Sequence, residues 1–307
     1  MLGSQPWILL ERATPAIVHH HTGKQMAIIY HYCDPQAFVS IIQTGRFWVS
    51  DARKTNDRRE LAVFKELAFE HIRELAKLDA SVQTFSSQLD FHFDAVAGIS
   101  DYYVCCFSEA DDSVPQWVAY GERGTGFAIG LDVNEVRTAI GAPILDSSYR
   151  DLDFDGPQSK WLFGKTIYAE SGKKTESLLK FLSKLIRSGQ NLGTQPARDF
   201  IDRLCAFYKD QSFSSEQEWR IIYNSSRNVL DRLGEEPEAA NENLTTLWRQ
   251  GRYGLTPYIC TPDLRKCIRE IVIGPSNIDR ATHTYVTQFL QSLNIECDVR
   301  QSKSPYR

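Results

Sequence analysis

Long hydrophobic runs are missing from this sequence of 307 residues. No apolar run approaches the roughly 18 residues that a membrane-spanning helix needs, so we expect no transmembrane segment and no membrane partner. The first 22 residues also lack the charged start, apolar centre and small-residue cleavage site of a secretory signal. Together these absences predict a cytoplasmic protein.

An excess of one charge is missing as well. The 35 Lys and Arg residues nearly balance the 39 Asp and Glu residues, which leaves a formal net charge of −4. A polybasic coat for general polyanion binding is therefore excluded, whereas a local basic groove is not. With 42% apolar and 11% aromatic residues, the chain has the composition of a globular protein and not of a disordered one.

Paired cysteines of the CxxC type do not occur. The seven cysteines are odd in number, and most lie in apolar or aromatic stretches such as residues 102–107. Buried free thiols in a reducing compartment explain this use better than disulfides or zinc. The histidines beyond the run His19–His21 are scattered, so we expect no bound metal.

The common nucleotide-binding and hydrolase motifs are also absent. There is no phosphate loop, no HExxH, no GxSxG and no dinucleotide-binding fingerprint after a strand. The glycines Gly121, Gly124 and Gly126 have the wrong spacing for the last of these. Any function must therefore rest on a less common arrangement of residues.

Hydrophobic periodicity predicts alternating strands and helices. Asp34-Pro35 provides a helix cap and a proline at the first helical position, and Gly45 provides the stop. The predicted strands are 27–33, 46–50, 102–107, 126–131, 163–169, 218–223, 258–261, 268–273 and 296–300. The predicted helices are 35–44, 58–78, 173–187, 198–209 and 278–293, with a short helix or loop at 111–120. Residues 133–157 are predicted as a loop-rich stretch, and 224–254 as a helical excursion or lid.

These elements predict an α+β fold with a single mixed sheet. We expect an N-terminal extension, residues 1–26, and one domain, residues 27–307. Helical insertions about residues 58–80, 173–210 and 225–255 account for the extra length.

The predicted strand 218–223 carries an unusual pair of charges. Alternation places Glu218, Arg220 and Ile222 on one face. Two charges on one side of an apolar strand are costly to bury unless they are paired or functional. The alternative to a functional site is an ordinary ion pair on a solvent-exposed face of the strand. For His31, a hydrogen-bonded core histidine is likewise the alternative to a site residue.

Several ordered blocks resemble the bacterial domain-of-unknown-function family 2971 over about residues 28–307. The blocks are Tyr30-His31-Tyr32, Ser40-Ile41-Ile42, Gly45, Phe47-Trp48-Val49-Ser50, Asn56-Asp57, Glu60, Phe107-Ser108-Glu109, Gln116-Trp117, Tyr120-Gly121, Gly126-Phe127-Ala128-Ile129-Gly130, Glu216-x-Glu218-Trp219-Arg220, Glu270-Ile271-Val272-Ile273-Gly274-Pro275 and Pro305-Tyr306-Arg307.

A more distant likeness implies a function. A strand with a central histidine, a helix ending in Ile-x-x-Gly and a short strand resemble the start of the ADP-ribosyltransferase fold. Poly-ADP-ribose polymerases, RNA 2′-phosphotransferases and the DNA-modifying DarT toxins open in a similar way. Those enzymes place a glutamate on a late strand, some within a Glu-x-Glu pair, which Glu216-Gln217-Glu218 resembles. The likeness is one of fold and implies NAD as the substrate.

The resemblance also implies roles for individual residues. Glu218 would stabilise the oxocarbenium-like state when the nicotinamide–ribose bond breaks, and Glu216 would assist the acceptor. His31 would bind the adenosine-side ribose, and backbone groups near Tyr32 would hold the nicotinamide amide. The further cofactor-binding candidates are Ser50, Arg53 and Arg220 for polar contacts, the two arginines for the pyrophosphate, and Trp117 or Tyr120 for stacking. For Arg220, an ion pair with Glu218 is equally compatible with the sequence.

Three functions follow as hypotheses. The first is an NAD-dependent mono-ADP-ribosyltransferase, as a toxin or anti-phage effector that modifies nucleic acid or protein. The second is a metal-dependent nuclease or nucleic-acid-binding module whose carboxylates are Glu109, Asp111, Asp112, Glu216 and Glu218. The third is a non-enzymatic ligand sensor that retains the cleft.

Overall fold

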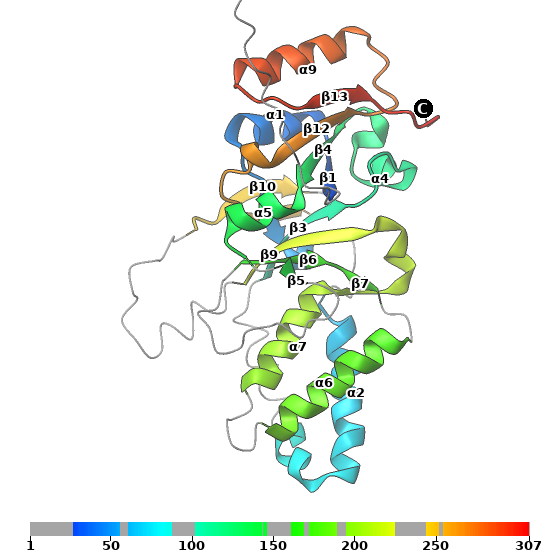
Figure 1. Cartoon of the computed structure of the whole chain (residues 1–307), viewed down its shortest axis with the longest axis vertical. Coiled ribbons are helices and arrows are strands. Elements are labelled where there is room, and N and C mark those ends of the chain that lie inside the picture. The colour runs from blue at the N-terminus through cyan, green and yellow to red at the C-terminus, as the bar shows by residue number, and fades with distance from the viewer. Residues whose placement is uncertain are drawn as a thin grey trace, which may run out of the picture.

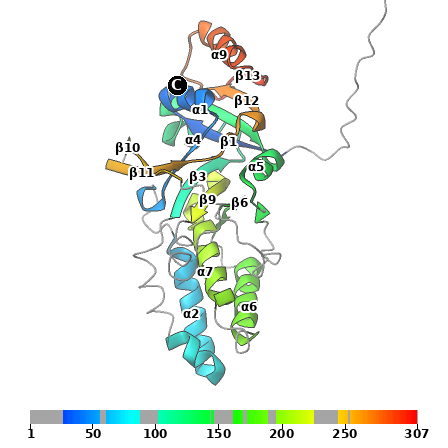
Figure 2. The same ribbon diagram turned by 90° about the vertical axis from the view of Figure 1, so that its left-hand side faces the viewer.

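The computed structural model describes residues 27–55, 61–87, 102–142, 144–145, 161–168, 172–188, 195–224, 244–251 and 254–306. Predictions for residues 1–26, for Asn56, Asp57 and Glu60, and for 225–243 lie outside this part of the chain. The described residues form a mixed α+β structure, as predicted, in which strands from Ile28 to Gln301 join an 11-stranded sheet (Figures 1 and 2).

The first elements follow from their capping residues. Strand β1 (Ile28–Cys33) leads to helix α1 (Pro35–Thr44), where the Asp34 carboxylate accepts from the Ala37 amide at 2.8 Å. Gly45 ends the helix in the left-handed conformation with φ 69°, which suits a residue without Cβ. Strand β2 (Trp48–Asp51) follows. This part of the prediction is confirmed.

The sheet has a continuous path and a branch. The path runs β10-β11-β2-β3-β1-β4-β12-β13, and β9 joins β3 on its other edge, followed by β6 and β5. The remaining bounds are β3 Tyr102–Ser108, β4 Phe127–Asp132, β5 Ile144–Leu145, β6 Trp161–Lys165, β9 Glu218–Asn224, β10 Leu247–Gly251, β11 Gly254–Cys260, β12 Ile268–Ile273 and β13 Asp298–Gln301. All neighbours are antiparallel except β12 with β13 and β5 with β6, which are parallel.

One edge of β3 is only partly paired, and this positions the site. On that edge β2 pairs with β3 at Val104 and β1 pairs with it at Ser108, and residues 105–107 have no described strand partner between them. On the opposite edge β9 pairs along all of β3 and begins at Glu218. Strands β1 and β2 therefore diverge along β3, and the sheet opens beside the start of β9.

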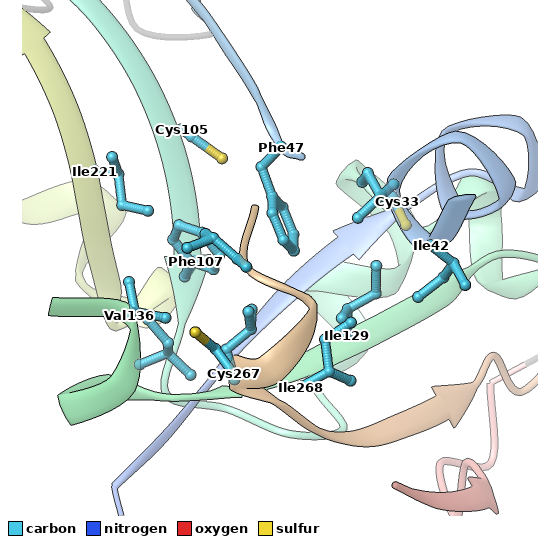
Figure 3. Packing of buried hydrophobic residues seen from close by; sticks show 14 of the residues in the cluster. Cys33, Ile42, Phe47, Cys105, Phe107, Ile129, Val136, Ile221, Cys267 and Ile268 are labelled. Atoms are coloured by element: carbon cyan, nitrogen blue, oxygen red, sulfur yellow. The ribbon is translucent and has the colours of Figure 1, made fainter. Parts of the chain in front are cut away.

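Each face of the sheet has its own apolar core. The first contains Phe47, Phe107 and Ile221 together with the buried thiols Cys33, Cys105 and Cys267 (Figure 3). All seven cysteines are free and four are buried, Cys205 being the fourth, so the thiol prediction is confirmed. Burial raises the pKa of these thiols and keeps them protonated.

The second core joins the opposite face of the sheet to three helices. Helices α2 (Val63–Leu78), α6 (Lys173–Ser188) and α7 (Gln195–Phe207) lie together at the lower end of the molecule (Figures 1 and 2). Their buried residues pack against side chains of β3, β6 and β9, including Val104, Leu162 and Ile222. The predicted helical insertions about 58–80 and 173–210 thus contain α2 and the pair α6 and α7. Among the described residues, no helix is long and apolar enough to cross a bilayer.

Three local predictions were wrong. Residues Val133–Ile140 form helix α5 and not a loop, because the Asp132 side chain caps it and Gly141 ends it. Helix α7 ends at Phe207, and the chain continues as the short strand β8 (Tyr208–Lys209), which pairs with β7 (Ile167–Tyr168). The described end of the predicted insertion 225–255 forms strand β10 and not a helix. Helices α4 (Val114–Ala119) and α9 (Ala281–Ser292) agree with prediction.

Candidate functional site

A cleft of about 850 Å³ opens where β1 and β2 diverge along β3. Its volume lies within the range of small-molecule sites, about 300–1,000 Å³. The structure brings most of the predicted site residues to its wall, and His31 and Glu218 both line it although they are 187 positions apart. The predicted residues that line the cleft are His31, Tyr32, Ser50, Tyr120, Glu216 and Glu218.

His31 is held by the unpaired edge of β3. Its Nδ1 lies 2.9 Å from the Cys106 carbonyl oxygen, in the stretch of β3 that pairs with neither β1 nor β2. Because a carbonyl only accepts, Nδ1 carries the proton in this contact, and Nε2 of the neutral ring is an acceptor. The imidazole packs against Phe47 and Phe107, with ring centroids 5.2 and 5.5 Å away.

The protonation state of His31 follows from its surroundings. Desolvation lowers the pKa of His31, the Cys106 carbonyl opposes this change, and the charge of Arg249 lowers the pKa further. The ring is therefore neutral near pH 7. A neutral histidine with one nitrogen fixed as donor is suited to accept a hydrogen bond from a ligand hydroxyl.

Glu218 lies in a buried ion cluster at the start of β9. Arg220 Nε donates to Oε1 at 3.0 Å, and Arg220 Nη2 and Lys209 Nζ donate to Oε2 at 3.2 and 3.0 Å. The side chains of Glu218, Arg220 and Lys209 are 3%, 1% and 2% exposed. Glu218 and Arg220 thus share a face, as alternation predicted, and the pair is buried and not on the surface.

The ion cluster makes the stability of the fold sensitive to acid. Burial alone would raise the pKa of Glu218, but the charges of Arg220 and Lys209 and hydrogen bonds from Arg220 and the Cys106 thiol lower it from 4.5 to about 2. The stabilisation is complete above pH 4.5 and is lost as the pH falls toward 2, which amounts to about 3 kcal/mol.

We therefore expect the free energy of unfolding in urea to fall between pH 5 and pH 2. Carboxyl signals followed by ¹³C nuclear magnetic resonance report the titration of Glu218 directly. A midpoint near 4.5 for this carboxyl in the folded protein would contradict the assigned ion cluster.

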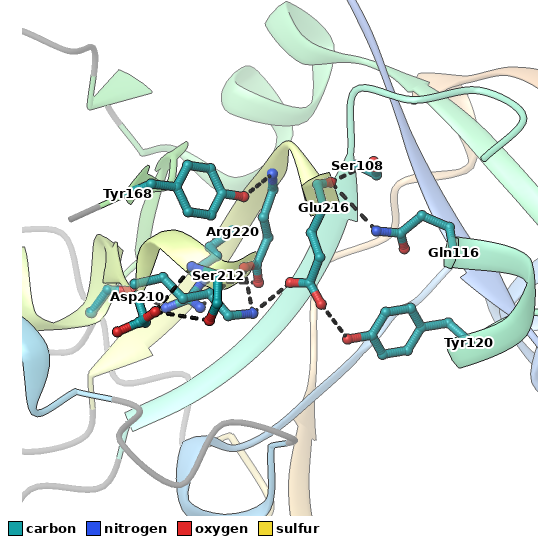
Figure 4. A network of polar contacts seen from close by, with 11 residues as sticks. Ser108, Gln116, Tyr120, Tyr168, Asp210, Ser212, Glu216 and Arg220 are labelled. Carbon is teal, nitrogen blue, oxygen red and sulfur yellow. Dashed lines mark hydrogen bonds and ion pairs between the residues drawn. The ribbon is translucent and has the colours of Figure 1, made fainter. Parts of the chain in front are cut away.

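Glu216 occupies a different environment from Glu218. Tyr120 Oη donates to Oε1 at 3.0 Å, and Lys209 Nζ donates to Oε2 at 2.6 Å (Figure 4). The side chain is 16% exposed, against 3% for Glu218. Burial, with the nearby Glu216 charge, raises the pKa of Tyr120, so its hydroxyl stays protonated and donates.

A short turn brings both carboxylates to the cleft. The 3₁₀ segment Gln211–Glu216 returns the chain from Lys209 to Glu216, and Asp210 caps it by accepting from the Ser212 amide at 3.0 Å. Gln217 then adopts a left-handed conformation with φ 45°. The Ser108 hydroxyl, donating to the Glu216 carbonyl at 2.7 Å, holds this turn against β3 (Figure 4).

Three predicted site residues do not line the cleft. Trp117 is fully buried, where its Nε1 donates to Asp112 at 2.7 Å and its ring meets Tyr32 edge-on at 4.7 Å, so it is a core residue and not a stacking platform. Arg220 is directed to Glu218 and to the Ala206 carbonyl at 2.7 Å, so it is an ion-pair partner and not a pyrophosphate ligand.

Arg53 is the third of these residues. Its guanidinium binds the Asp51 carboxylate two residues earlier, with Nε at 2.9 Å from Oδ1 and Nη2 at 2.5 Å from Oδ2. It lies outside the lining of the cleft. The predicted pyrophosphate role of Arg53 therefore does not fit its position.

Sequence reasoning missed two cations of the cleft. Lys209 had been placed at the end of a helix, although a single lysine after the apolar run Ala206–Tyr208 is a signal for a buried charge. Arg249 lies in β10, in a stretch predicted as a helical excursion. Neither Lys209 nor Arg249 belongs to the sequence blocks that carry the family resemblance. Their contacts with Glu216 and Ser50 are therefore seen only in the folded chain.

One family model matches the part of the chain that contains the two carboxylates. Residues 116–221 match the model of a family described as "Protein of unknown function (DUF2971)". The resemblance to this family is confirmed over that stretch. It contains Tyr120, Lys209, Glu216 and Glu218 but not His31. No curated protein and no solved structure matches the chain.

Three of the carboxylates suggested for a metal-dependent nuclease bind different partners. Asp111 pairs with Arg300 at 2.8 Å. Asp112 accepts from the Trp117 indole, the Ser302 hydroxyl and the backbone amides of Lys303 and Ser304. Glu109 accepts from Lys165 and from the Trp219 indole. Within the part of the chain that the structure describes, no three His, Cys, Asp or Glu residues are grouped to hold a metal ion.

Proposed function

We propose that this protein is an NAD-dependent mono-ADP-ribosyltransferase with an ADP-ribosyltransferase-type fold. The supporting observation is that His31 of β1 and the Glu216-x-Glu218 pair at the start of β9 line one cleft. The cleft has the volume of a small-molecule site. The proposal also depends on the likeness of the opening strand–helix–strand unit to that fold.

In the proposed reaction, the bond between the nicotinamide nitrogen and the ribose C1′ of NAD breaks. Nicotinamide leaves with the bonding electrons, and the positive charge that develops on the ribose needs a nearby carboxylate. The acceptor then forms a bond to C1′ and gives its proton to a base, for which a carboxylate of the pair is suited. His31 Nε2 would accept from a ribose hydroxyl.

Contact geometry favours Glu216 over Glu218 as the carboxylate that faces the substrate. A carboxylate offers about four acceptor positions, and Glu218 uses them on two Arg220 nitrogens, Lys209 and the Cys106 thiol. Glu216 accepts only from Tyr120 and Lys209 among the described residues, so it keeps acceptor positions for a ligand. We therefore assign Glu218 to positioning Lys209, and through it Glu216, which exchanges the roles expected from the sequence.

We also propose a class of acceptor for the ADP-ribose group. Following the likeness to the DarT toxins, we propose a nucleic acid or protein acceptor and a role as a toxin or anti-phage effector. Because the net charge is −4, a nucleic acid would have to be bound by a local groove and not by the surface as a whole.

Nicotinamide release from NAD, with transfer of labelled ADP-ribose, tests the proposal. We expect His31→Phe to lower kcat/KM for NAD about tenfold, because it keeps an aromatic ring between Phe47 and Phe107 but removes Nε2 and the Nδ1 contact with the Cys106 carbonyl. The matched control His283→Phe changes a histidine outside the cleft, whose Nε2 contacts the Val299 carbonyl, and should not alter turnover. Absence of nicotinamide release by the wild-type protein with bound NAD would refute the proposal.

Ligand binding without turnover is the second candidate function. It is favoured by the saturation of Glu218 with donors, which leaves Glu216 as the available carboxylate of the Glu216-x-Glu218 pair. The same assay separates the two functions, because a sensor binds NAD with a measurable affinity and releases no nicotinamide.

A further inference from the structure

Part of the wall of the cleft is formed by β2, β11 and β10. Ser50 pairs with Tyr258, and Arg249 pairs with Thr256. Directly paired residues and residues two apart share a face of a sheet, so Trp48, Ser50, Thr256 and Arg249 lie on the same side. All four line the cleft.

Arg249 has unused hydrogen-bonding capacity. Its Nη2 donates to Ser50 Oγ at 3.0 Å, and its guanidinium carbon lies 5.5 Å from the centre of the Trp48 ring. Its Nε is buried and has no hydrogen-bond partner among the described residues, and Arg249 forms no ion pair with any of them. A buried guanidinium donor without an acceptor is costly, so the fold retains a group that a ligand would satisfy.

The charges along the cleft separate into two groups. Lys209 is neutralised by Glu216 and Glu218. The other cations that line the cleft are Lys54, Arg123 and Arg249, and the other anions are Asp34 and Glu122. Three cations and two anions leave one net positive charge in this second group.

We propose that Arg249, anchored by Ser50 and supported by the Trp48 ring, forms a subsite for the phosphoryl groups of a nucleoside diphosphate. The planar guanidinium presents parallel donors that fit phosphate oxygens, and its contact with an aromatic ring limits its orientation. Excess positive charge favours a group with two phosphates over a single carboxylate. For NAD as the ligand, the inference rests on the proposed function; for the subsite itself, it rests on the contacts of Arg249.

Calorimetric titration with ADP, adenosine and inorganic pyrophosphate tests the subsite in the full chain. We expect Arg249→Gln to weaken ADP binding about 10-fold to 100-fold and to leave adenosine binding unchanged. Arg249→Lys keeps the charge but loses the planar fork, so it should be intermediate. The control Arg137→Gln removes a cation of α5 that is outside the cleft and should bind ADP as the wild type does. Thermal melting checks that each variant is folded.

The outcomes separate the subsite from the proposed reaction. Wild-type affinity for ADP in folded Arg249→Gln, or a wild-type protein that binds neither ADP nor pyrophosphate, would overturn the subsite. ADP binding that depends on Arg249, in a protein that releases no nicotinamide, supports the subsite and refutes the transferase. Nicotinamide release with an unchanged KM for NAD in Arg249→Gln supports the transferase and overturns the subsite.

Discussion

Replacing Arg220 by methionine should lower the free energy of unfolding by about 3–5 kcal/mol. The guanidinium contributes two of the donors to Glu218 and binds the Ala206 carbonyl, and both charged side chains are at most 3% exposed. Without Arg220, the buried Glu218 carboxylate retains only Lys209 as a cation. Urea unfolding followed by circular dichroism measures the change.

The control for this substitution is Arg265→Met. Arg265 binds Asp263 two residues earlier with the same two-nitrogen geometry, but its side chain is 36% exposed and that of Asp263 is 46% exposed. An exposed ion pair of this kind contributes at most about 1 kcal/mol. Equal losses in the two variants would show that burial of the Glu218 cluster does not contribute to stability.

Replacing Glu216 by glutamine should reduce kcat/KM for NAD by about 100-fold or more, while the protein remains folded. The amide keeps the shape of the side chain and an acceptor for Tyr120, but it no longer carries the charge that stabilises a cationic ribose or receives a proton. Lys209 retains Glu218 as its partner. The stability cost is therefore about 2 kcal/mol, which is less than the cost of removing Arg220.

The matched substitution Glu176→Gln supplies the control for activity. Glu176 lies on α6 with its side chain 70% exposed, outside the cleft, and its replacement should leave turnover unchanged. If Glu216→Gln turns over NAD at the wild-type rate and a folded Glu218→Gln does not, then Glu218 is the carboxylate that faces the substrate. The assignment made from the sequence would then be restored.

Local structure at the beginning of the chain was predictable because its signals are local. Asp34, Pro35 and Gly45 specify the start and the end of α1 within eleven positions, and the strands beside it read as apolar runs. The same reasoning should have found α5, since Asp132 and Glu135 have the spacing of a capping residue and an acidic first turn. That helix was missed because the prediction grouped its short apolar face with the polar residues that follow it in the sequence.

The site was predictable only in part, because the sequence pattern shows neither which charges are buried nor which groups they pair with. The sequence indicated that Glu218 and Arg220 share a face, but it did not indicate that Lys209 lies between two carboxylates. It proposed Arg53 and Arg220 for phosphate, and the structure engages both with carboxylates nearby. Arg249, whose buried Nε has no hydrogen-bond partner among the described residues, lies on a strand that the sequence pattern did not reveal.

The sequence by itself determined the class of the protein: a mixed α+β chain with free, mostly buried thiols, helices added to a sheet, two carboxylates near the start of one strand and a histidine within another. These properties depend on composition, periodicity and capping, which act over a few residues. Only the tertiary structure decided which charges are neutralised and which remain available. The reason is physical: burial and partnership set the state of a charged group, and both depend on where β3 leaves its edge unpaired and which strands meet beside it.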